Sequence, residues 1–595
     1  MARRRSWVRP VSPVGAIALG VSALVGCTSP PHRASASSIV LDPSGDAVYV
    51  ASPDDDAVVA IDARTLEERW RVSVVGAPTQ LAIVGGELLV SLDLANKVAW
   101  VDLGDRSVRR STVPCGGTRA VVADGSGGAL VSCPYDDRVL SLDAAGVRWV
   151  IASPGRPTAL AVRGDAFAVS APRTGLVRVC SLSDGALREE RTLEAAPGFA
   201  AVEVDALDWD DDGELVVSFV RVDRDSDRGR PPADGGYGRV REGEGRIEPR
   251  LAASFGTTYA RFDRTARALS GPSALAVRGD VVWIAARSSD RVAAFARRSS
   301  GGLLDHRVTF AVGRGPRGIA VSDDGRTAYV DVGYGHTVAR LELDAGLDGP
   351  EGELREATLE RTRAFAADRL SEDALRGRGL FDDANDTHLT PSGVLTCATC
   401  HPDGGDDGLS WFLHTETVGP KLRRTPPAWG ARPGMEPFHW DGEFDDAGAL
   451  SDATIRALME GDALLVDTDA IAAWMREAPI PVGRAAEDAG DAARIERGAD
   501  VFARAGCDAC HAGELFADGA VHDVVPRSSD DAAALGMVST PSLRGVRARA
   551  PFLHDGRAPT LRAMLDEANE ENRHGDTAAL TEDERADLVR YLESL

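Results

Sequence analysis

Short apolar runs separated by glycine and aspartate turns fill the first part of the chain. The phrase Gly-x-Pro-x-x-Leu-Ala, followed by Ile or Val, begins at Gly76 and Gly155, and a shorter Gly-Pro version begins at Gly271 and Gly315. Turn-plus-strand units such as residues 42–50 lie between these phrases. Short strands that recur roughly every 40 residues predict the four-stranded blades of a β-propeller.

The repeats place an all-β propeller of seven blades at residues 38–344. Its blades are predicted to begin near Ser38, Pro78, Thr118, Pro157, Ala206, Pro272 and Pro316. The fifth interval is long because residues 223–250, rich in Gly, Asp and Arg, form an insertion, which we interpret as a loop on one face.

Two strands of this region, Val-Tyr-Val-Ala at 48–51 and Ala-Tyr-Val-Asp at 328–331, resemble the signature strand of the YVTN-type propeller family. The resemblance implies a fold and specifies no catalytic residue. We interpret the propeller as a scaffold or docking surface, with a small-molecule catalytic site as the alternative.

Three cysteines lie in the propeller. Cys115 and Cys133 fall in neighbouring strands of one predicted blade. They are expected either to form a disulfide in an oxidising compartment or to remain two buried thiols. Cys180 has no evident partner and is interpreted as a small buried apolar residue.

The pattern becomes helical after the propeller. A linker helix is predicted at 345–369, followed by two all-α domains at 370–480 and 481–595 that repeat one plan. The repeated segments are Gly377 to Phe381 with Gly498 to Phe502, Thr425-Pro426 with Thr540-Pro541, and Pro437 to Gly442 with Pro551 to Gly556. A glycine with an apolar pair three and four residues later suits a helix that packs against a haem edge or against another helix. Thr581 is expected to cap the last helix.

One pentapeptide carries the chemistry of this half and occurs twice. Cys-x-x-Cys-His is the attachment signature of c-type haem, in which two thiols bond to the vinyl groups and the adjacent imidazole binds the iron. The predicted cysteines and proximal histidines are Cys397, Cys400 and His401, and Cys507, Cys510 and His511. Dithiol redox sites or zinc sites are the alternative, but zinc requires two such pairs to converge on one ion. We therefore expect two covalently attached haems.

The tandem haem motifs, with Thr-Pro-x-x-x-Gly and Pro-Phe-x-x-Asp-Gly, resemble the bacterial di-haem cytochrome c peroxidase family, which includes the MauG-type enzymes. The resemblance spans residues 370–595. It implies that one haem relays electrons while the other meets peroxide at an open or displaceable axial position. It also leaves room for a structural calcium ion.

The resemblance also implies ligands and a bridging residue around the first haem. His414 falls near the offset of the family's displaceable histidine, His439 lies beside the repeated Asp-Gly, and Met459 is a third option that also suits the core. Trp440 occupies the position of the family tryptophan between the haems. An indole there would serve as an electron bridge or as an aromatic core residue.

The second haem departs from the family pattern. Ala568 stands where Met or Tyr is expected, so Met564 one helical turn earlier, His554 or water would fill the sixth position. The family segment that supplies an acid for O–O cleavage has no clear counterpart. Met459-Glu460 is a faint echo of it, so Glu460 is the candidate acid.

An export signal is predicted at the N-terminus. Three arginines at 3–5 precede an apolar run at 14–25, and the run ends in Leu-Val-Gly-Cys27, which resembles a bacterial lipobox. The resemblance implies removal of residues 1–26, lipidation of Cys27 and a tether at 27–37. An uncleaved anchor or an ordinary signal peptide is the alternative. Thr28 favours the outer membrane, with the protein facing the periplasm or the cell surface.

Composition narrows the partners. The chain of 595 residues is 43% apolar and 27% charged, which indicates a globular protein, and its net charge is −25. Such an acidic surface argues against nucleic acid and against anionic lipid bound through a basic face.

Three functions compete. The first is an exported di-haem c-type cytochrome of peroxidase-like architecture. It would pass electrons between its haems and reduce hydrogen peroxide, or use it to oxidise a substrate, with electrons from a redox partner protein or a small donor. The second is a non-catalytic electron-transfer cytochrome whose propeller docks a partner. The third is an interaction protein whose propeller recruits a partner to the haem domains. The missing Met/Tyr and Glu signals weigh against the first function, whereas Trp440 and the repeated segments favour it.

Overall fold

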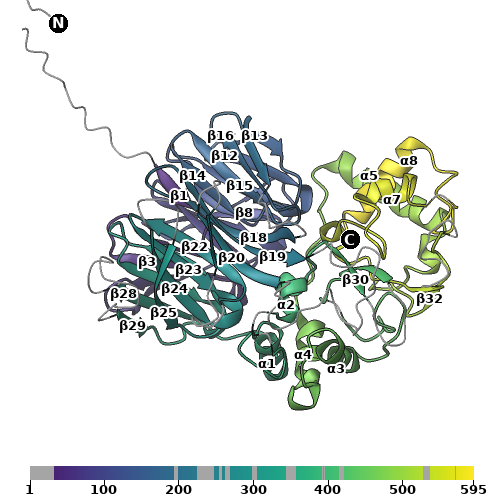
Figure 1. Ribbon diagram of the computed structural model, residues 1–595. Coiled ribbons are helices and arrows are strands. Elements are labelled where there is room, and N and C mark those ends of the chain that lie inside the picture. The colour runs from purple at the N-terminus through teal and green to yellow at the C-terminus, as the bar shows by residue number, and fades with distance from the viewer. Residues whose placement is uncertain are drawn as a thin grey trace, which may run out of the picture. The chain divides into compact units, whose positions relative to one another are not determined.

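The computed structural model describes residues 32–192, 199–223, 247–253, 258–261, 269–297, 304–343, 357–391, 393, 395–413, 421–429, 431–526, 536–569 and 571–595. The predicted signal peptide, Cys27, most of the insertion at 223–250 and His414 lie outside these residues. A strand-rich N-terminal region precedes a C-terminal region of helices and loops (Figure 1).

The N-terminal region consists of consecutive antiparallel sheets. The first sheet contains β2 (Ile39–Leu41), β3 (Ala47–Ser52), β4 (Ala57–Asp62) and β5 (Glu68–Ser73). The second contains β6 (Pro78–Val84), β7 (Glu87–Leu92), β8 (Lys97–Asp102) and β9 (Val108–Thr112). The third contains β10 (Val121–Ala123), β11 (Ala129–Cys133), β12 (Arg138–Asp143) and β13 (Gly146–Ala152).

The remaining sheets keep the same order of pairing. The fourth contains β14 (Leu160–Arg163), β15 (Ala166–Ala171), β16 (Leu176–Ser181) and β17 (Leu187–Thr192). Next come β18 (Phe199–Trp209), β19 (Leu215–Asp223), β20 (Ile247–Ala253) and β21 (Thr258–Arg261). The last two contain β22 (Pro272–Arg278), β23 (Val281–Ala286), β24 (Arg291–Arg297) and β25 (Leu304–Ala311), then β26 (Pro316–Val321), β27 (Thr327–Val332), β28 (Thr337–Leu343) and β29 (Ala357–Arg361).

These sheets confirm the predicted β-propeller. Apolar side chains of one blade pack on the next, as Val58 and Ala60 do against Leu88 and Val90. Six blades are described with nearly all of their side chains. The predicted count of seven includes β18–β21, whose strands pair in the blade order, while all side chains of β20 and β21 lie outside the described residues.

A recurring polar turn explains the Gly-x-Pro repeat. In several blades the residue between the second and third strands has a left-handed backbone, which short polar side chains tolerate. Its side-chain oxygen accepts hydrogen bonds from backbone N–H groups at or beside the glycine that precedes the next blade. The residues in this position are Asp56, Asn96, Asp137 and Asp290. The repeat therefore ties each of these blades to its successor.

One short strand precedes the first blade. β1 (Arg33–Ser35) pairs antiparallel with β14, the first strand of the fourth blade. Ser37 forms a bridge with Leu81, and the Ser38 hydroxyl donates to Asp331 at 2.6 Å. From His32 onward, the segment predicted as a tether at 27–37 is therefore part of the propeller.

The linker prediction is wrong in one respect. Residues 357–361 form β29 rather than a helix, and β29 pairs with β28 as the outer strand of the last blade. Because β28 would otherwise leave an unpaired edge, the sheet takes this segment as its fourth strand. The propeller therefore extends to Arg361.

The C-terminal region has two helical halves. The first contains α1 (Glu372–Phe381), α2 (Cys397–Cys400), α3 (Ala447–Ala457), α4 (Thr468–Glu477) and the hairpin β30 (Ser410–Leu413) with β31 (Lys421–Arg424). The second contains α5 (Ala489–Arg504), α7 (Leu561–Asp566), α8 (Glu582–Leu592) and the pair β32 (Val521–His522) with β33 (Val538–Ser539). Thr581 caps α8 through a capping box with Glu584, as predicted.

The repeated glycines have a packing reason. A Cβ on Gly377 would lie 1.8 Å from the carbonyl oxygen of Ala470, and one on Gly498 would lie 2.1 Å from that of Asp587. Glycine therefore permits α1 to contact α4 closely, and α5 to contact α8. The duplication seen in the sequence is a duplication of helix pairs.

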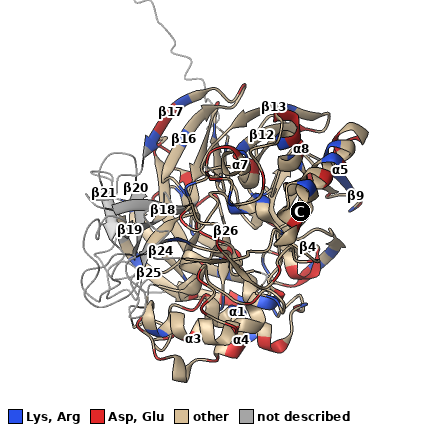
Figure 2. Ribbon diagram, turned by 90° about the vertical axis from the view of Figure 1, so that its right-hand side faces the viewer, with Lys and Arg blue, Asp and Glu red and all other residues tan. Residues whose placement is uncertain are grey.

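Charges of both signs are interspersed over the described elements (Figure 2). Among the helices that the structure describes, none combines the length and apolarity that a membrane crossing requires.

Candidate haem sites

The first attachment segment is a single helical turn. Thr396 caps α2 by exchanging hydrogen bonds with Thr399, which fixes the turn that presents Cys397 and Cys400. Nδ1 of His401 lies 3.1 Å from the carbonyl oxygen of Gly405, which leaves Nε2 as the nitrogen available to a metal. Burial lowers the pKa of His401, so the imidazole is neutral, the form that binds iron.

A large cavity lies against this segment. It encloses about 1470 Å³ of space outside the protein atoms, including its mouth to solvent. Most of its wall is apolar and comes from the first half, including Trp411, Trp429 and Met475. Ser539 and Arg549 extend the wall into the second half.

Two buried arginines supply donors beside this cavity. Arg549 lines it, and Arg424 donates a hydrogen bond to the Arg549 carbonyl oxygen. Nε of each guanidinium is buried and has no hydrogen-bond partner among the described residues. Burial, with the nearby Arg424, lowers the pKa of Arg549 to about 10, so it is still charged at neutral pH. Such donors match the carboxylates of a haem, and the cavity, the cysteines and His401 fit the group.

The second attachment segment follows α5 and Gly506. Cys507 and Cys510 are half-buried, and Nδ1 of His511 lies 3.0 Å from the carbonyl oxygen of Phe516. Burial lowers the pKa of His511. The arrangement matches the first segment, with Nε2 again left for a metal.

His574 is a residue that the sequence reasoning missed. Its ring centre lies 6.1 Å from that of His511. Burial and the neighbouring His511 lower its pKa to about 4. Its only signal in the sequence is its membership of the histidines clustered between His388 and His574.

Each of the two repeated Pro-Phe-x-x-Asp-Gly loops accepts a hydrogen bond from the opposite half of the haem region. Backbone N–H of Ser539, in the second half, donates to the Trp440 carbonyl oxygen at 2.9 Å. Backbone N–H of Arg424, in the first half, donates to the equivalent carbonyl oxygen of His554 at 2.6 Å. The rings of Trp440 and His554 have centres 6.4 Å apart. Each loop is thus held by the other half, and these two rings lie between the halves.

Three of the predicted residues of the first haem lie at the cavity. His439, Trp440 and Met459 line it. Nδ1 of His439 lies 3.5 Å from a carboxylate oxygen of Glu443, and its ring packs edge-on against Phe444. Trp440 donates its indole N–H to the Arg424 carbonyl oxygen at 2.8 Å. The Met459 sulfur lies 4.0 Å from that of Cys397.

The other predicted residues are more distant or outside the description. Glu460 is exposed and does not line the cavity. Met564 packs with the apolar cluster around Phe502 and Leu588, and His554 is buried. His414 lies outside the described residues. Their roles as ligand or acid stay predictions.

The sequence reasoning also missed an acidic group near the cavity. Asp407 is buried and accepts a hydrogen bond of 2.9 Å from the indole N–H of Trp411, which lines the cavity. Burial raises the pKa of Asp407 to about 6. The carboxyl group can therefore exchange a proton near neutral pH.

Propeller arginines hold the loop that follows His401. Asp403 pairs with Arg119 at 2.6 Å and with Arg287 at 2.9 Å. Asp406, which is fully buried, pairs with Arg173 at 2.7 Å and with Arg424 at 3.0 Å. Burial opposes ionisation of Asp406, but the arginines outweigh it and hold its pKa below the usual range. We call this set of ion pairs the Asp403–Asp406 clasp.

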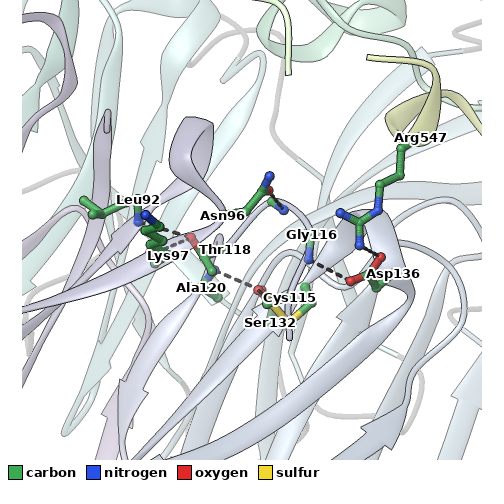
Figure 3. The surroundings of a disulfide bond; sticks show 12 residues. Leu92, Asn96, Lys97, Cys115, Gly116, Thr118, Ala120, Ser132, Asp136 and Arg547 are labelled. Carbon is green, nitrogen blue, oxygen red and sulfur yellow. Dashed lines mark hydrogen bonds and ion pairs between the residues drawn. A yellow bond between two sulfur atoms is a disulfide. The ribbon is translucent and has the colours of Figure 1, made fainter. Parts of the chain in front are cut away.

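A disulfide supports a further contact between the propeller and the haem region (Figure 3). Cys115 and Cys133 are bonded, with Cys115 in the connection between the second and third blades rather than in a strand. The backbone N–H of the adjacent Gly116 donates to Asp136 at 2.8 Å, and Asp136 also pairs with Arg547 of the haem region. Of the two alternatives, a disulfide or two buried thiols, the disulfide is confirmed, whereas the predicted placement of both cysteines in strands of one blade is wrong.

Comparisons with known proteins agree with this chemistry. A family model for cytochrome c matches residues 495–595. The methylamine utilization protein MauG of Methylorubrum extorquens is 30% identical over 279 residues, which are 37% of this chain and 76% of that protein. Cytochrome-c peroxidase IdrP2 of Denitromonas iodatirespirans is 25% identical over 37% of this chain and 80% of that protein. A hydrazine synthase structure from Kuenenia stuttgartiensis, 16% identical, covers 55% of this chain and 95% of its own with a TM-score of 0.40.

The similarity to MauG extends over 76% of that relative. The chain therefore belongs, through its C-terminal region, to the MauG-like family of c-type cytochromes.

Proposed function

We propose that this protein is an exported di-haem c-type cytochrome that reduces hydrogen peroxide or uses it to oxidise another molecule. One haem would be attached at Cys397 and Cys400, and the other at Cys507 and Cys510. The observation that carries the proposal is the cavity against His401, which reaches Trp440 and Arg549 at the junction of the two halves. The similarity to MauG and to a cytochrome-c peroxidase supports it.

A haem at His401 supplies an iron with which peroxide can react. The chain would supply the rest. The apolar wall limits water at the reaction site. Nδ1 of His439 lies 3.5 Å from a Glu443 carboxylate oxygen, and this pair is proposed to accept and return protons. Reduction of one peroxide to two waters takes two electrons and two protons, so an external donor, a redox protein or a small molecule, must supply electrons.

Trp440 is the proposed electron bridge. Its position between the halves, its hydrogen bond to Arg424 and its contact with His554 hold the indole where a transfer path would run. The propeller, seven-bladed when β18–β21 is counted, would serve as the scaffold that holds the clasp and as a surface for a partner protein. Lipidation at Cys27, which would anchor the protein to the outer membrane, and a structural calcium ion also stay predictions.

A pure electron carrier is the second candidate. Met435, Met459 and Met475 all line the cavity, and a thioether sulfur is a common sixth ligand of c-type haem iron. A methionine that stayed bound to the iron of the first haem in every redox state would close that iron to peroxide. The two functions therefore differ in whether peroxide reaches the first haem.

The test uses the fully reduced, full-length protein mixed anaerobically with peroxide. One equivalent of hydrogen peroxide is expected to reoxidise both haems. In Trp440→Phe the oxidation of the second haem should lag by roughly tenfold or more, equivalent to about 1.4 kcal/mol of barrier, because the indole path is lost.

Stopped-flow absorption at the haem bands measures both steps. Trp70→Phe, which alters a half-buried tryptophan on β5 of the propeller, is the matched control and should behave as the parent protein. Haems that stay reduced in the parent would reject the peroxidase function. Parent-like transfer in Trp440→Phe would reject the bridge alone.

A further inference from the structure

His511 and His574 face each other with a spacing that suits one metal ion between them. Their ring centres are 6.1 Å apart and their planes meet at 39°. Two imidazoles on opposite sides of one ion, each with a metal–nitrogen distance of about 2.0–2.1 Å and a nitrogen about 1.1–1.2 Å from its ring centre, would have centres roughly 6.3 Å apart. The observed spacing is too long for ring stacking in direct contact and close to this value.

The available ring nitrogens agree with this reading. Nδ1 of His511 is used by the hydrogen bond with the Phe516 carbonyl oxygen, so Nε2 is the nitrogen left for a metal. For the ring of His574, the described part of the chain offers no hydrogen-bond acceptor or ion-pair partner. An imidazole that lies beside another imidazole without such a partner is well suited to ligate a metal.

The loop that carries His574 is rigidly built. The Asn569 side chain accepts a hydrogen bond from the His574 N–H at 2.8 Å and donates to the carbonyl oxygens of His574 and Gly575. It also donates to the hydroxyl of Thr577, which in turn donates to the Leu565 carbonyl oxygen on α7. One amide thus fixes both ends of the turn around His574.

The same loop is attached to the haem-binding segment. The N–H of Asp576 donates to the Ala505 carbonyl oxygen at 2.9 Å. A Cβ on Gly575 would lie 3.2 Å from that carbonyl oxygen, a tight approach, and 3.4 Å from the Cys507 sulfur, an ordinary van der Waals contact. The turn that carries His574 is therefore hydrogen-bonded to the segment that leads into Cys507 and His511.

We propose that His574 is the axial ligand opposite His511 on the iron of the haem attached at Cys507 and Cys510. The proposal rests on the second haem of the proposed function, and it replaces Met564 and His554 as the candidates for this position. Met564 packs with the apolar cluster of α5 and α8, and His554 lies beside Trp440 at the junction of the halves. His574 faces His511.

This assignment gives the two haems different tasks. An iron bound by two imidazoles has no open position, so the second haem stores and passes electrons and does not bind peroxide. Among the described residues, no imidazole faces His401 in the way that His574 faces His511. The cavity at His401 is then the place where peroxide reacts.

The experiment compares electron paramagnetic resonance and near-infrared magnetic circular dichroism of the full-length ferric protein with those of His574→Ala. The parent is expected to show a low-spin signal with the charge-transfer band of bis-imidazole ligation. In His574→Ala that signal should be lost and replaced by a high-spin signal, and added imidazole should restore it. In His574→Met the charge-transfer band should shift to that of histidine–methionine ligation.

His522→Ala is the matched control, because His522 lies in the same half and its ring is bound to Asp518 at 2.7 Å. It should keep the parent spectrum. A bis-imidazole signal that persists in His574→Ala would overturn the proposal, as would a parent without that signal. Restoration by imidazole distinguishes loss of a ligand from misfolding. Because the readout is the second haem's spectrum, a failure here is distinct from a first haem that ignores peroxide.

Discussion

Replacing Asp406 by asparagine is expected to lower the free energy of unfolding by about 3–5 kcal/mol, the cost of removing one partner from a buried ion pair. Asp406 is fully buried between Arg173 of the propeller and Arg424 of the haem region. An amide of the same size would leave both guanidinium groups without their counter-charge in a site that excludes water. Urea unfolding, followed by the haem band and tryptophan fluorescence, measures the loss.

The pH dependence of that loss has a definite sign. Because the pKa of Asp406 is held below its usual range, its stabilising contribution is complete at neutral pH. It declines only as the pH falls below about 3.9, the ordinary value for an unfolded chain, and on through the folded value. The difference in the free energy of unfolding between the parent protein and Asp406→Asn should therefore become smaller only at acidic pH.

Asp165→Asn is the matched control for this experiment. Asp165 pairs with Arg188 at 2.8 Å, but both side chains are largely exposed, so the variant should unfold like the parent. An unchanged unfolding curve for Asp406→Asn would contradict a stabilising role for the Asp403–Asp406 clasp.

His439→Asn is expected to lower the rate of peroxide turnover by roughly 10²–10⁴-fold, the usual effect of removing a group that transfers protons. His439 lines the cavity and lies 3.5 Å from Glu443, so the pair can deliver a proton to a reacting oxygen. Asparagine suits the site because His439 has a φ of 65°, a left-handed conformation that Asn tolerates.

The same variant separates the two roles considered for His439. If His439 were the sixth ligand, its removal would convert the first haem from low to high spin and speed its reaction with peroxide. If it transfers protons, the ferric spectrum should stay as in the parent while turnover falls. His306→Asn, on β25 of the propeller and bonded to Thr309, is the control. Parent-like turnover in His439→Asn would contradict the proton-transfer role.

The propeller was largely predictable because its signals are local. Gly-x-Pro phrases and Asp/Asn turns mark several of the blades, and the predicted starts at Pro78, Pro272 and Pro316 coincide with β6, β22 and β26. β29 was missed because its strand pairs with an open edge that only the folded sheet creates. The count of seven blades still depends on β18–β21.

The haem motifs were predictable because Cys-x-x-Cys-His is contiguous, and the repeated segments revealed the two halves. The residues around the motifs were harder. In the sequence, Asp403 and Asp406 resemble ordinary surface acids, because the propeller arginines that they pair with lie more than 100 residues away along the chain. His574 lies 63 residues from His511, and only the fold brings the two rings 6.1 Å apart.

The haem at His401 is expected to be open to peroxide, whereas the haem at His511 is expected to be closed to it. Electron paramagnetic resonance and optical spectra of the full-length protein, oxidised and half-reduced, before and after peroxide, test it directly. We predict one low-spin haem indifferent to peroxide, and a high-spin signal in at least one redox state that peroxide consumes. Two low-spin haems unaffected by peroxide in both states would rule out an open first haem and leave an electron carrier.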